Sequence, residues 1–401
     1  MSSDVAELER AVDGMPDDWR EVAVADVVAM LPGFAFKSEH FVTDTDEGLP
    51  LIRIRDLGQT ATVTRYVGGY GEAYAVQDGD VLVGMDGEFA AVRWQGGKAL
   101  LNQRVLKLST ARPDVLNEGY LFYRVQPSLS ELEQTIGGTT VKHLSTKDLK
   151  RLTWQLPPLD EQRRIAEVLR SVDEAIAASR HVLSQMSAAK AAERRDAFSA
   201  TASATLDPGL AKQGWSSTRL GKVFRERKEK GVTGLPVASV SIEQGLVLRA
   251  DLDRRVASNL PPEGHSLVRR DDIAYNMMRM WQGACGMATT DCLVSPAYVV
   301  MTPTPDLDPR FAHHMLRSEP VIGLLHAYSQ GIVDDRLRLY PQAFSQIPIN
   351  LPPLVIQREI AELLDAYVDG EAVAAKELSA KEAMKAALMS DLLSGRVRLP
   401  A

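Results

Sequence analysis

The sequence predicts an α+β protein built as an internal pseudo-two-fold repeat, with two similar mixed domains separated by two long antiparallel helices. One phrase occurs twice, Leu156-Pro157-Pro158-Leu159 and Leu351-Pro352-Pro353-Leu354, at an offset of 195 residues in a chain of 401. In each copy two prolines end an extended stretch, and a segment with apolar residues at helical spacing follows. An offset close to half the chain indicates a duplication.

The repeat extends beyond that phrase. Trp19 and Trp215 open the two copies, and residues 78–82 are echoed by residues 269–273. Each copy combines a strand-leaning region with a helix of about 40 residues. The expected segments, in chain order, are an acidic tail over 1–18, a mixed domain over 19–155, a helix over 156–205, a second mixed domain over 214–350, and a second helix with a C-terminal segment over 351–398.

Short β-branched runs between glycine-rich turns mark the mixed domains as α+β. We expect strands over 60–67, 81–83 and 104–108, and short helices over 115–124 and 308–316.

After each Pro-Pro pair, apolar residues recur at spacings of three and four over several heptads. This pattern predicts long helices that pack together as a coiled-coil pair, each on the order of 50 Å long at 1.5 Å per residue. The alternative is two ordinary amphipathic helices, each packed on its own domain.

Net charge is −7, which at first argues against a nucleic-acid partner. Much of the negative charge lies within residues 1–18, however, and residues 219–230 are rich in Arg and Lys. A basic run of this kind is also typical of a solvent-exposed surface that binds no partner.

Cys285 and Cys292 belong to no Cys/His cluster, and the chain shows neither a secretory signal nor an apolar run of membrane-spanning length. We therefore expect a cytoplasmic protein that binds no metal and has no membrane partner. No P-loop and no dinucleotide fingerprint occur, and the neighbours His313 and His314 point apart on a helix. The sequence thus favours a chain without a catalytic centre or a cofactor of its own.

Residues 156–166, their second copy from Leu351, and residues 392–399 closely resemble the specificity subunits of type I restriction-modification enzymes. The resemblance covers the chain after residue 18, although Val355-Ile356 replace the family's usual acidic residue before Gln357. It implies that the mixed domains are target-recognition domains, each reading one half of a split sequence in double-stranded DNA, with the paired helices as a ruler for the gap.

The resemblance also implies partners. Two methyltransferase subunits would use S-adenosylmethionine to methylate adenine, and a motor and nuclease subunit would use ATP and Mg²⁺ to cut DNA. Two alternatives remain open: a recognition subunit of a methylation-only or non-cleaving defence system, and a helical scaffold whose duplicated domains bind protein.

Candidate DNA-contacting residues are polar side chains near glycine turns at matching places in the two copies, since Arg, Lys, Gln and Asn read base edges. They are Gln103, Arg104, Lys142, His143 and Lys147 in the first copy, and Asn276, Arg279, Gln330, Arg336 and Arg338 in the second. Equally, they could be exposed charges on unremarkable loops.

Candidate contacts to the methyltransferase subunits are the repeated residues at the helix starts. They are Pro157, Pro158, Gln162, Ile165, Pro352, Pro353, Gln357 and Ile360. The alternative is that these residues only set the angle between domain and helix, which a duplication would also repeat.

Overall fold

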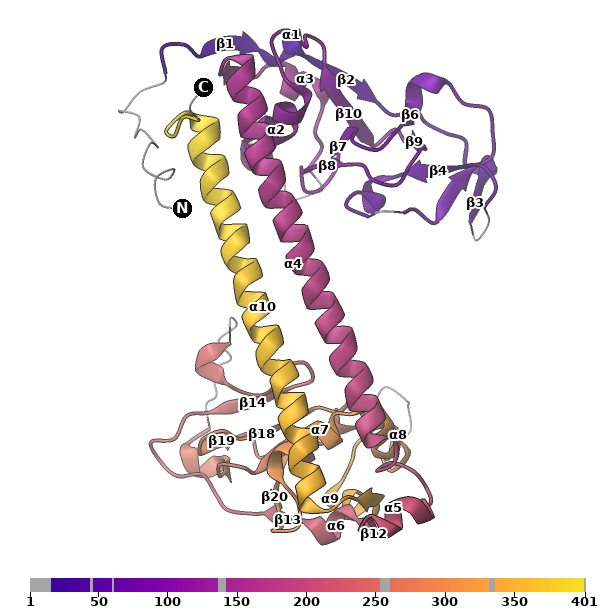
Figure 1. Ribbon diagram of the computed structural model, residues 1–401, viewed down its shortest axis with the longest axis vertical. Helices are drawn as coiled ribbons and strands as arrows, with labels where there is room; N and C mark the ends of the chain where they lie inside the picture. Colours follow the sequence, from indigo (N-terminus) through magenta and orange to yellow (C-terminus); the bar gives the residue numbers. More distant parts are fainter. Residues whose placement is uncertain are drawn as a thin grey trace. The chain divides into compact units, whose positions relative to one another are not determined.

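The two copies of the repeat fold into two units in the computed structural model (Figure 1). The structure describes residues 16–43, 46–59, 61–135, 142–252, 260–331 and 336–399. Unit 1 comprises the chain up to Ala178 together with the residues from Leu378 onward, and unit 2 comprises Ser179–Glu377. Most of the acidic tail, residues 1–15, lies outside the described residues.

Unit 1 contains three antiparallel or mixed sheets and a set of helices. A two-stranded sheet pairs β1 (Arg20–Ala23) with β11 (Thr153–Leu156). A four-stranded sheet has the strand order β2 (Val28–Pro32), β10 (Val105–Thr110), β7 (Val81–Gly84), β8 (Ala91–Arg93). A five-stranded sheet has the strand order β3 (Phe41–Thr43), β5 (Thr64–Tyr66), β4 (Leu49–Ile52), β9 (Ala99–Leu101), β6 (Ala75–Val76). The helices are α1 (Val24–Val27), α2 (Glu118–Thr135) and α3 (Thr146–Lys150), with 3-10 turns at Ser38–His40, Ile54–Asp56 and Glu72–Tyr74.

Unit 2 repeats the two- and four-stranded sheets. β12 (Ser216–Arg219) pairs with β21 (Pro348–Leu351), and β13 (Phe224–Arg227), β20 (Tyr298–Pro303), β17 (Ile273–Asn276) and β18 (Cys285–Met287) form the four-stranded sheet. Two two-stranded sheets replace the larger sheet: β14 (Ala238–Ser241) pairs with β15 (Gly245–Leu248), and β16 (Ser266–Val268) pairs with β19 (Cys292–Val294). The helices are α5 (Pro208–Lys212), α6 (Leu220–Val223), α7 (Pro309–Leu316), α8 (Glu319–Ala327) and α9 (Pro341–Gln346), with 3-10 turns at Arg249–Asp251, Pro262–Gly264 and Met280–Gln282.

The long helices α4 (Leu159–Ser199) and α10 (Leu354–Ser394) each run through both units. Each has 41 residues, which corresponds to about 60 Å at 1.5 Å per residue, longer than the sequence predicted.

Each unit buries the start of one long helix and the end of the other. In unit 1, Ile165 near the start of α4 and Leu392 near the end of α10 belong to one hydrophobic core. In unit 2, Leu364 of α10 and Phe198 of α4 share a core with Phe311 of α7. The idea that each helix packs only on its own domain is therefore wrong.

Polar contacts between the two helices have an antiparallel register in each unit. In unit 1, Lys385 Nζ lies 2.6 Å from a carboxylate oxygen of Asp173. In unit 2, Glu371 forms an ion pair with Lys190 and accepts a hydrogen bond of 2.7 Å from Ser187 Oγ. The predicted α+β repeat with an antiparallel helix pair is thus confirmed.

Several predicted elements have different bounds in the structure. Within the expected strand over 60–67 only Thr64–Tyr66 is extended and paired, and Thr60 lies outside the described residues. The helix expected over 115–124 starts at Glu118 and continues to Thr135, because Leu121, Val125 and Leu129 bury one face of it. In the described part of the chain, no helix has the length and apolar character needed to cross a membrane.

Candidate nucleic-acid interface and helix starts

In each unit, the residue that follows one inner strand of the four-stranded sheet is hydrogen-bonded to the segment before a short helix. The strand and helix are β7 and α3 in unit 1, and β17 and α9 in unit 2. Leu144 donates its backbone N–H to Met85 O at 2.7 Å in unit 1, and Leu339 donates to Met277 O at 2.9 Å in unit 2. Counting from these bonds, His143 and Arg338 occupy equivalent positions, and so do Asp86 and Met278. We call this place the strand-end site of each unit.

In unit 1 the strand-end site is built around Asp86. Arg104 forms an ion pair with one carboxylate oxygen, and His143 Nδ1 lies 2.7 Å from the other. Burial alone would raise the pKa of Asp86, but the hydrogen bonds from His143 and Arg104 hold it below its ordinary value. Two of the five predicted residues therefore meet at one carboxylate.

The other three predicted residues of unit 1, which the structure also describes, form no hydrogen bond or ion pair with the Asp86 side chain. Gln103 is exposed beside Arg104, the Lys142 ammonium donates to the backbone oxygen of Glu133, and Lys147 is exposed on α3. The site also depends on Asp86, which is not among the residues predicted from the sequence.

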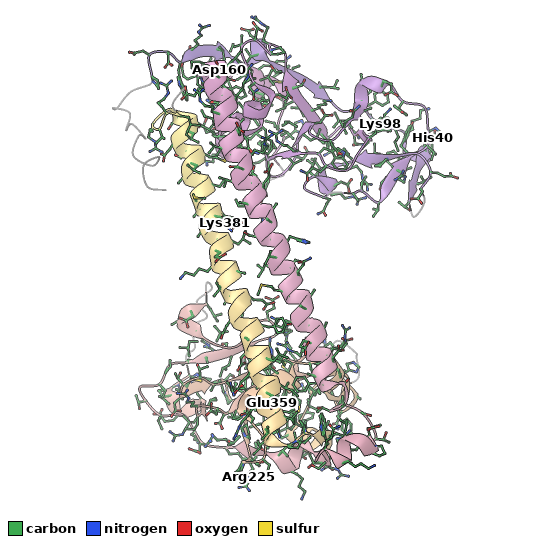
Figure 2. All side chains as sticks on the ribbon, viewed as in Figure 1. His40, Lys98, Asp160, Arg225, Glu359 and Lys381 are labelled. Atoms are coloured by element: carbon green, nitrogen blue, oxygen red, sulfur yellow. The ribbon has the colours of Figure 1, made fainter. Side chains whose placement is uncertain are left out.

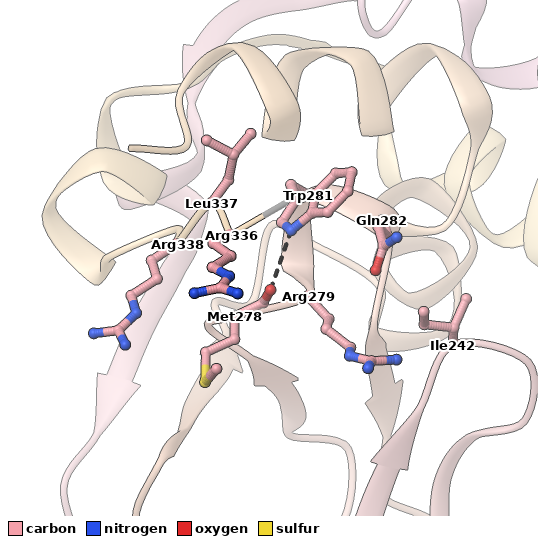
Figure 3. A pocket seen from close by; sticks show the side chains of 8 residues that line it. All are labelled: Ile242, Met278, Arg279, Trp281, Gln282, Arg336, Leu337 and Arg338. Carbon is pink, nitrogen blue, oxygen red and sulfur yellow. Dashed lines mark hydrogen bonds between the residues drawn. The ribbon is translucent and has the colours of Figure 1, made fainter. Parts of the chain in front are cut away.

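In unit 2 the strand-end site is a hollow of about 580 Å³ lined by three of the five predicted residues (Figure 3). Arg279 follows β17, and Arg336 and Arg338 lie in the segment before α9. Met278, 56% exposed, and Ile242, 37% exposed, add apolar surface. Trp281, Gln282 and Leu337 complete the lining, and Trp281 Nε1–H donates to Met278 O at 3.1 Å.

The remaining two predicted residues shape this hollow. Asn276 Oδ1 accepts the backbone N–H of Met278 at 3.0 Å, so the amide carbonyl holds the turn after β17. Gln330 and Arg338 exchange two backbone hydrogen bonds of 2.9 Å each. Sequence reasoning missed Met278 and Trp281, because an exposed apolar side chain beside arginines becomes visible only once burial is known.

The charge balance at the strand-end site of unit 2 differs from that around Asp86 in unit 1. Among the described residues, no carboxylate lies within ion-pair distance of the guanidinium of Arg279, Arg336 or Arg338. Asp334 and Asp335, which precede Arg336, lie outside the described residues. The strand-end site of unit 2 therefore presents cationic donors over an apolar floor.

At the start of α4, Gln162 is buried and fully hydrogen-bonded. Its Nε2 donates to Val115 O at 2.9 Å and Pro157 O at 2.8 Å, and its Oε1 accepts from Asn117 N at 2.8 Å. The side chain thus joins the loop before α2 to the first turn of the long helix.

Gln357 repeats this arrangement at the start of α10. Its Nε2 donates to Asp306 O at 3.0 Å and Pro352 O at 2.9 Å, while its Oε1 accepts from Asp308 N at 2.9 Å. The same three bonds recur in the loop before α7, so the repeat of sequence is also a repeat of geometry.

Burial corrects part of the expected docking surface. Gln162 and Gln357 are each 1% exposed and Ile165 is 0% exposed, so these side chains offer a partner no surface and position the helices instead. Pro157 and Pro352 are buried, Pro353 and Ile360 are half-buried, and Pro158 is exposed. Pro157 and Pro158 line a hollow of about 260 Å³ at the start of α4.

The C-terminal phrase explains why the two helix starts differ. Arg398 donates to both carboxylate oxygens of buried Glu161 at 2.7 Å and to those of Asp18 at 2.8 and 3.0 Å, and these carboxylates raise its pKa. At the repeat offset Glu161 corresponds to Ile356 and Arg398 to Ser203. The acidic residue and its arginine are therefore absent together from unit 2.

Comparisons with known proteins agree with this geometry. Residues 16–186 match the family model described as the type I restriction modification DNA specificity domain. The type I restriction enzyme EcoBI specificity subunit of Escherichia coli is 29% identical, covering 90% of this chain and 83% of the relative. The MjaVIII specificity subunit of Methanocaldococcus jannaschii is 23% identical, covering 96% and 94%.

The chain is similar over nearly its whole length to type I restriction enzyme specificity subunits, and residues 16–186 carry the match to the DNA specificity domain. A crystal structure of the type I restriction-modification S subunit from M. genitalium has the same fold, with a TM-score of 0.60, 15% identity, and coverage of 95% of this chain and 97% of that one.

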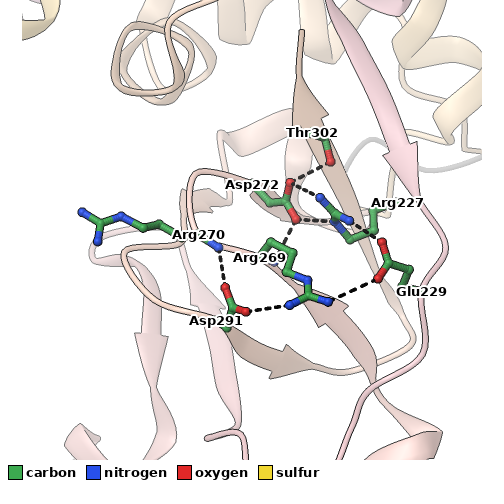
Figure 4. A network of polar contacts seen from close by, with 7 residues as sticks. All are labelled: Arg227, Glu229, Arg269, Arg270, Asp272, Asp291 and Thr302. Carbon is green, nitrogen blue, oxygen red and sulfur yellow. Dashed lines mark hydrogen bonds and ion pairs between the residues drawn. The ribbon is translucent and has the colours of Figure 1, made fainter. Parts of the chain in front are cut away.

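Part of the basic run over 219–230 serves the fold of unit 2. Arg227 is hydrogen-bonded to buried Asp272 at 2.5 and 3.2 Å (Figure 4), and Lys228 pairs with Glu226 at 3.3 Å. Arg269 lies 3.0 Å from Asp291. Lys222, Arg225 and Lys230 are exposed, so the run also retains positive charge at the surface.

Neither cysteine is poised for chemistry. Cys285 and Cys292 are free and buried, and burial raises their pKa values to about 12 and about 11. His314 faces Asp365, at 2.8 Å, rather than sharing a ligand with His313. No group of His, Cys, Asp and Glu in the described ranges is arranged to hold a metal ion.

Proposed function

We propose that this specificity subunit reads a bipartite target in double-stranded DNA, with one unit contacting each half. The observation that carries the proposal is the pair of strand-end sites, which place His143 and Arg338 at equivalent positions of two duplicated units. A duplicated reader is what a split target requires, because each half needs its own set of base contacts.

Reaction chemistry belongs to other subunits in this proposal. Partner methyltransferase subunits bind S-adenosylmethionine and methylate adenine, and a motor and nuclease subunit uses ATP and Mg²⁺ to translocate and cut DNA. The specificity subunit contributes recognition alone. Its buried, high-pKa thiols and internally paired carboxylates fit that division of labour.

The repeated helix starts support two methyltransferase subunits. Gln162 and Gln357 hold the same backbone geometry in both units, so the start of a long helix is presented twice. Pro158, Pro353 and Ile360 are the members of the predicted set that retain exposed surface. The paired helices α4 and α10 set the length of the unread gap.

Mapping of DNA methylation tests the function. The complete chain is produced with the methyltransferase subunit of its own genome, and methylated adenines are located with and without it. We expect a split motif that depends on this chain. A methylated motif without a gap, or methylation by the purified chain alone, contradicts the proposal.

Exchange of one reading domain tests independent reading. Residues 19–150 are replaced by those of a relative, with the helix starts kept. One half of the methylated motif is then expected to change while the other half and the gap stay the same. A change in both halves would show that the units do not read separately.

A further inference from the structure

We propose that unit 2 reads a guanine in its half of the target, and that Arg338 is the base-contacting residue. This inference rests on the proposed function. Guanine presents two acceptors, O6 and N7, on its major-groove edge, and a guanidinium can satisfy both at once. The strand-end site of unit 2 offers that donor set in a concave, partly apolar setting.

Arg338 is chosen over its neighbours because its backbone is fixed. Its N–H and C=O both bond to Gln330 at 2.9 Å, and the next residue, Leu339, is anchored to Met277 O. Leu337 and Leu339 are buried, so the chain alternates and the side chain of Arg338 faces outward (Figure 3). Because the backbone of Arg338 is already fixed, it loses little conformational freedom when the side chain binds DNA.

The surroundings favour a base edge over a phosphate. A phosphate contact needs only charge at an exposed rim, whereas this site sets the guanidiniums around the apolar side chains of Met278 and Ile242. A base edge combines hydrogen-bond acceptors with apolar atoms, such as a neighbouring thymine methyl group, and so matches both parts of the lining. Arg279 and Arg336 line the same hollow and supply additional positive charge (Figure 3).

Unit 1 provides an internal comparison. At the place of Met278 it has Asp86, and at the place of Arg338 it has His143, which pairs with that carboxylate. The carboxylate also engages Arg104. The two strand-end sites therefore differ in chemistry at equivalent positions, and the guanine prediction applies to the half-site of unit 2 alone.

Base analogues test the assignment with the complete chain in complex with its methyltransferase subunits. The half-site of unit 2 is first identified by exchanging residues 214–350. Each guanine in it is then replaced by 7-deazaguanine, which lacks the N7 acceptor, or by inosine, which keeps O6 and N7. Dissociation constants are measured at fixed salt for wild type, Arg338→Ala and the matched variant His143→Ala.

At one guanine we expect 7-deazaguanine to weaken wild-type binding by roughly 5- to 150-fold, with little effect of inosine. Arg338→Ala should show a comparable loss on natural DNA and no further loss with 7-deazaguanine. His143→Ala should keep the full 7-deazaguanine effect, because it belongs to the other unit. Thermal unfolding of both variants shows that the exposed substitutions leave the fold intact.

Three results would overturn the assignment. They are a half-site of unit 2 without guanine, an undiminished 7-deazaguanine effect in Arg338→Ala, and an Arg338→Ala loss that is equal on all sequences and accompanied by a smaller salt dependence, which marks a phosphate contact. All three results would still be compatible with a split methylated motif. If the proposed function itself were wrong, no split motif would be found by methylation mapping.

Discussion

Asp271 is the one non-glycine residue with a positive φ in the described part of the chain, at 69°. Its N–H donates to Ala288 O, just as Gly79 donates to Trp94 O in unit 1, where φ is 94°. The duplication therefore kept the turn and changed the residue. Because Gly79 corresponds to Asp271, the counterpart of residues 78–82 is 270–274, one residue later than the sequence alignment with 269–273. The next residue, Asp272, accepts hydrogen bonds from Thr302 and from the backbone of Arg269, which hold the turn in place (Figure 4).

Comparing Asp271→Gly with Asp271→Ala measures the energetic cost of the left-handed backbone conformation, because both substitutions remove the carboxylate. A left-handed conformation costs an L-residue on the order of 1 kcal/mol and costs glycine nothing. We expect Asp271→Gly to be more stable than Asp271→Ala by about 1 kcal/mol in urea unfolding. An alanine variant as stable as the glycine variant would contradict this reading of the turn.

His314 joins α7 to both long helices within unit 2. Its Nε2 lies 2.8 Å from Asp365 of α10, and its Nδ1 lies 3.4 Å from Nη2 of Arg194 of α4. The side chain is 2% exposed. Burial lowers the pKa of His314 below its ordinary value of 6.5, although the hydrogen bond to Asp365 opposes the shift, and the nearby cations Arg194 and Arg317 favour the neutral form.

The lowered pKa of His314 makes stability depend on pH. Below pH 6.5 the unfolded chain takes up a proton that folded His314 does not, so the contribution of His314 to the stability of unit 2 should fall with decreasing pH, by at most about 1.4 kcal/mol per pH unit. Comparing urea unfolding at pH 7.5 and 5.5, we expect His314→Gln to lose less stability on acidification than wild type. The exposed His181→Gln serves as control; an equal loss in all three proteins would exclude His314 as the cause.

At the scale of elements, one glutamine at each helix start connects a long helix to its domain. Gln357 bonds to three backbone groups, from Asp306, Asp308 and Pro352, and Gln162 does the same in unit 1. The Pro-Pro pair ends the preceding strand, and the glutamine then fixes the loop before α7 against the first helical turn. The angle-setting role is the one that these contacts support.

Replacing Gln357 by Leu should lower the free energy of unfolding by about 2–3 kcal/mol, because buried backbone groups lose their partners. Urea unfolding measures the loss. Glu359→Ala, on the exposed side of the same helix (Figure 2), is the matched control and should change stability by under about 0.5 kcal/mol. A leucine variant as stable as this control would mean that the glutamine does not hold the helix start.

At the scale of the whole molecule, both long helices pass through both units, and their contacts are antiparallel in each. If the pair sets the unread gap, as proposed, the gap should follow helix length. An insertion in one helix would shift the register of the seam. Insertions in both, after Ala177 and after Ala380, preserve it when each adds seven residues.

Matched seven-residue insertions add about 10 Å to each helix, or roughly 3 base pairs at 3.4 Å per pair. We expect the methylated motif to keep both halves and to gain a gap of about that size. Methylation mapping of the insertion variant against wild type measures it. An unchanged gap with an active complex would rule out the ruler.

Local signals in the chain were sufficient for the helix starts and for the duplication. Proline geometry and apolar spacing act within a few residues, so Pro157, Pro352 and the segments after them are readable without a fold. The strand expected over 60–67 shrank to Thr64–Tyr66, because pairing with β3 and β4 decides where a strand ends. The basic run over 219–230 was misleading for a similar reason, since Asp272 is distant in sequence but adjacent to Arg227 in space.

The sequence by itself determined the two-fold repeat, the long helices and the family, because these depend on short motifs and on their spacing. Only the tertiary structure decided that Gln162, Ile165 and Gln357 are interior. It also decided that Asp86 contacts Arg104 and His143, whereas the equivalent residue in unit 2, Met278, gives Arg338 an apolar neighbour in the same hollow. The physical reason is that burial and charge pairing depend on neighbours brought together by folding, often from distant parts of the chain.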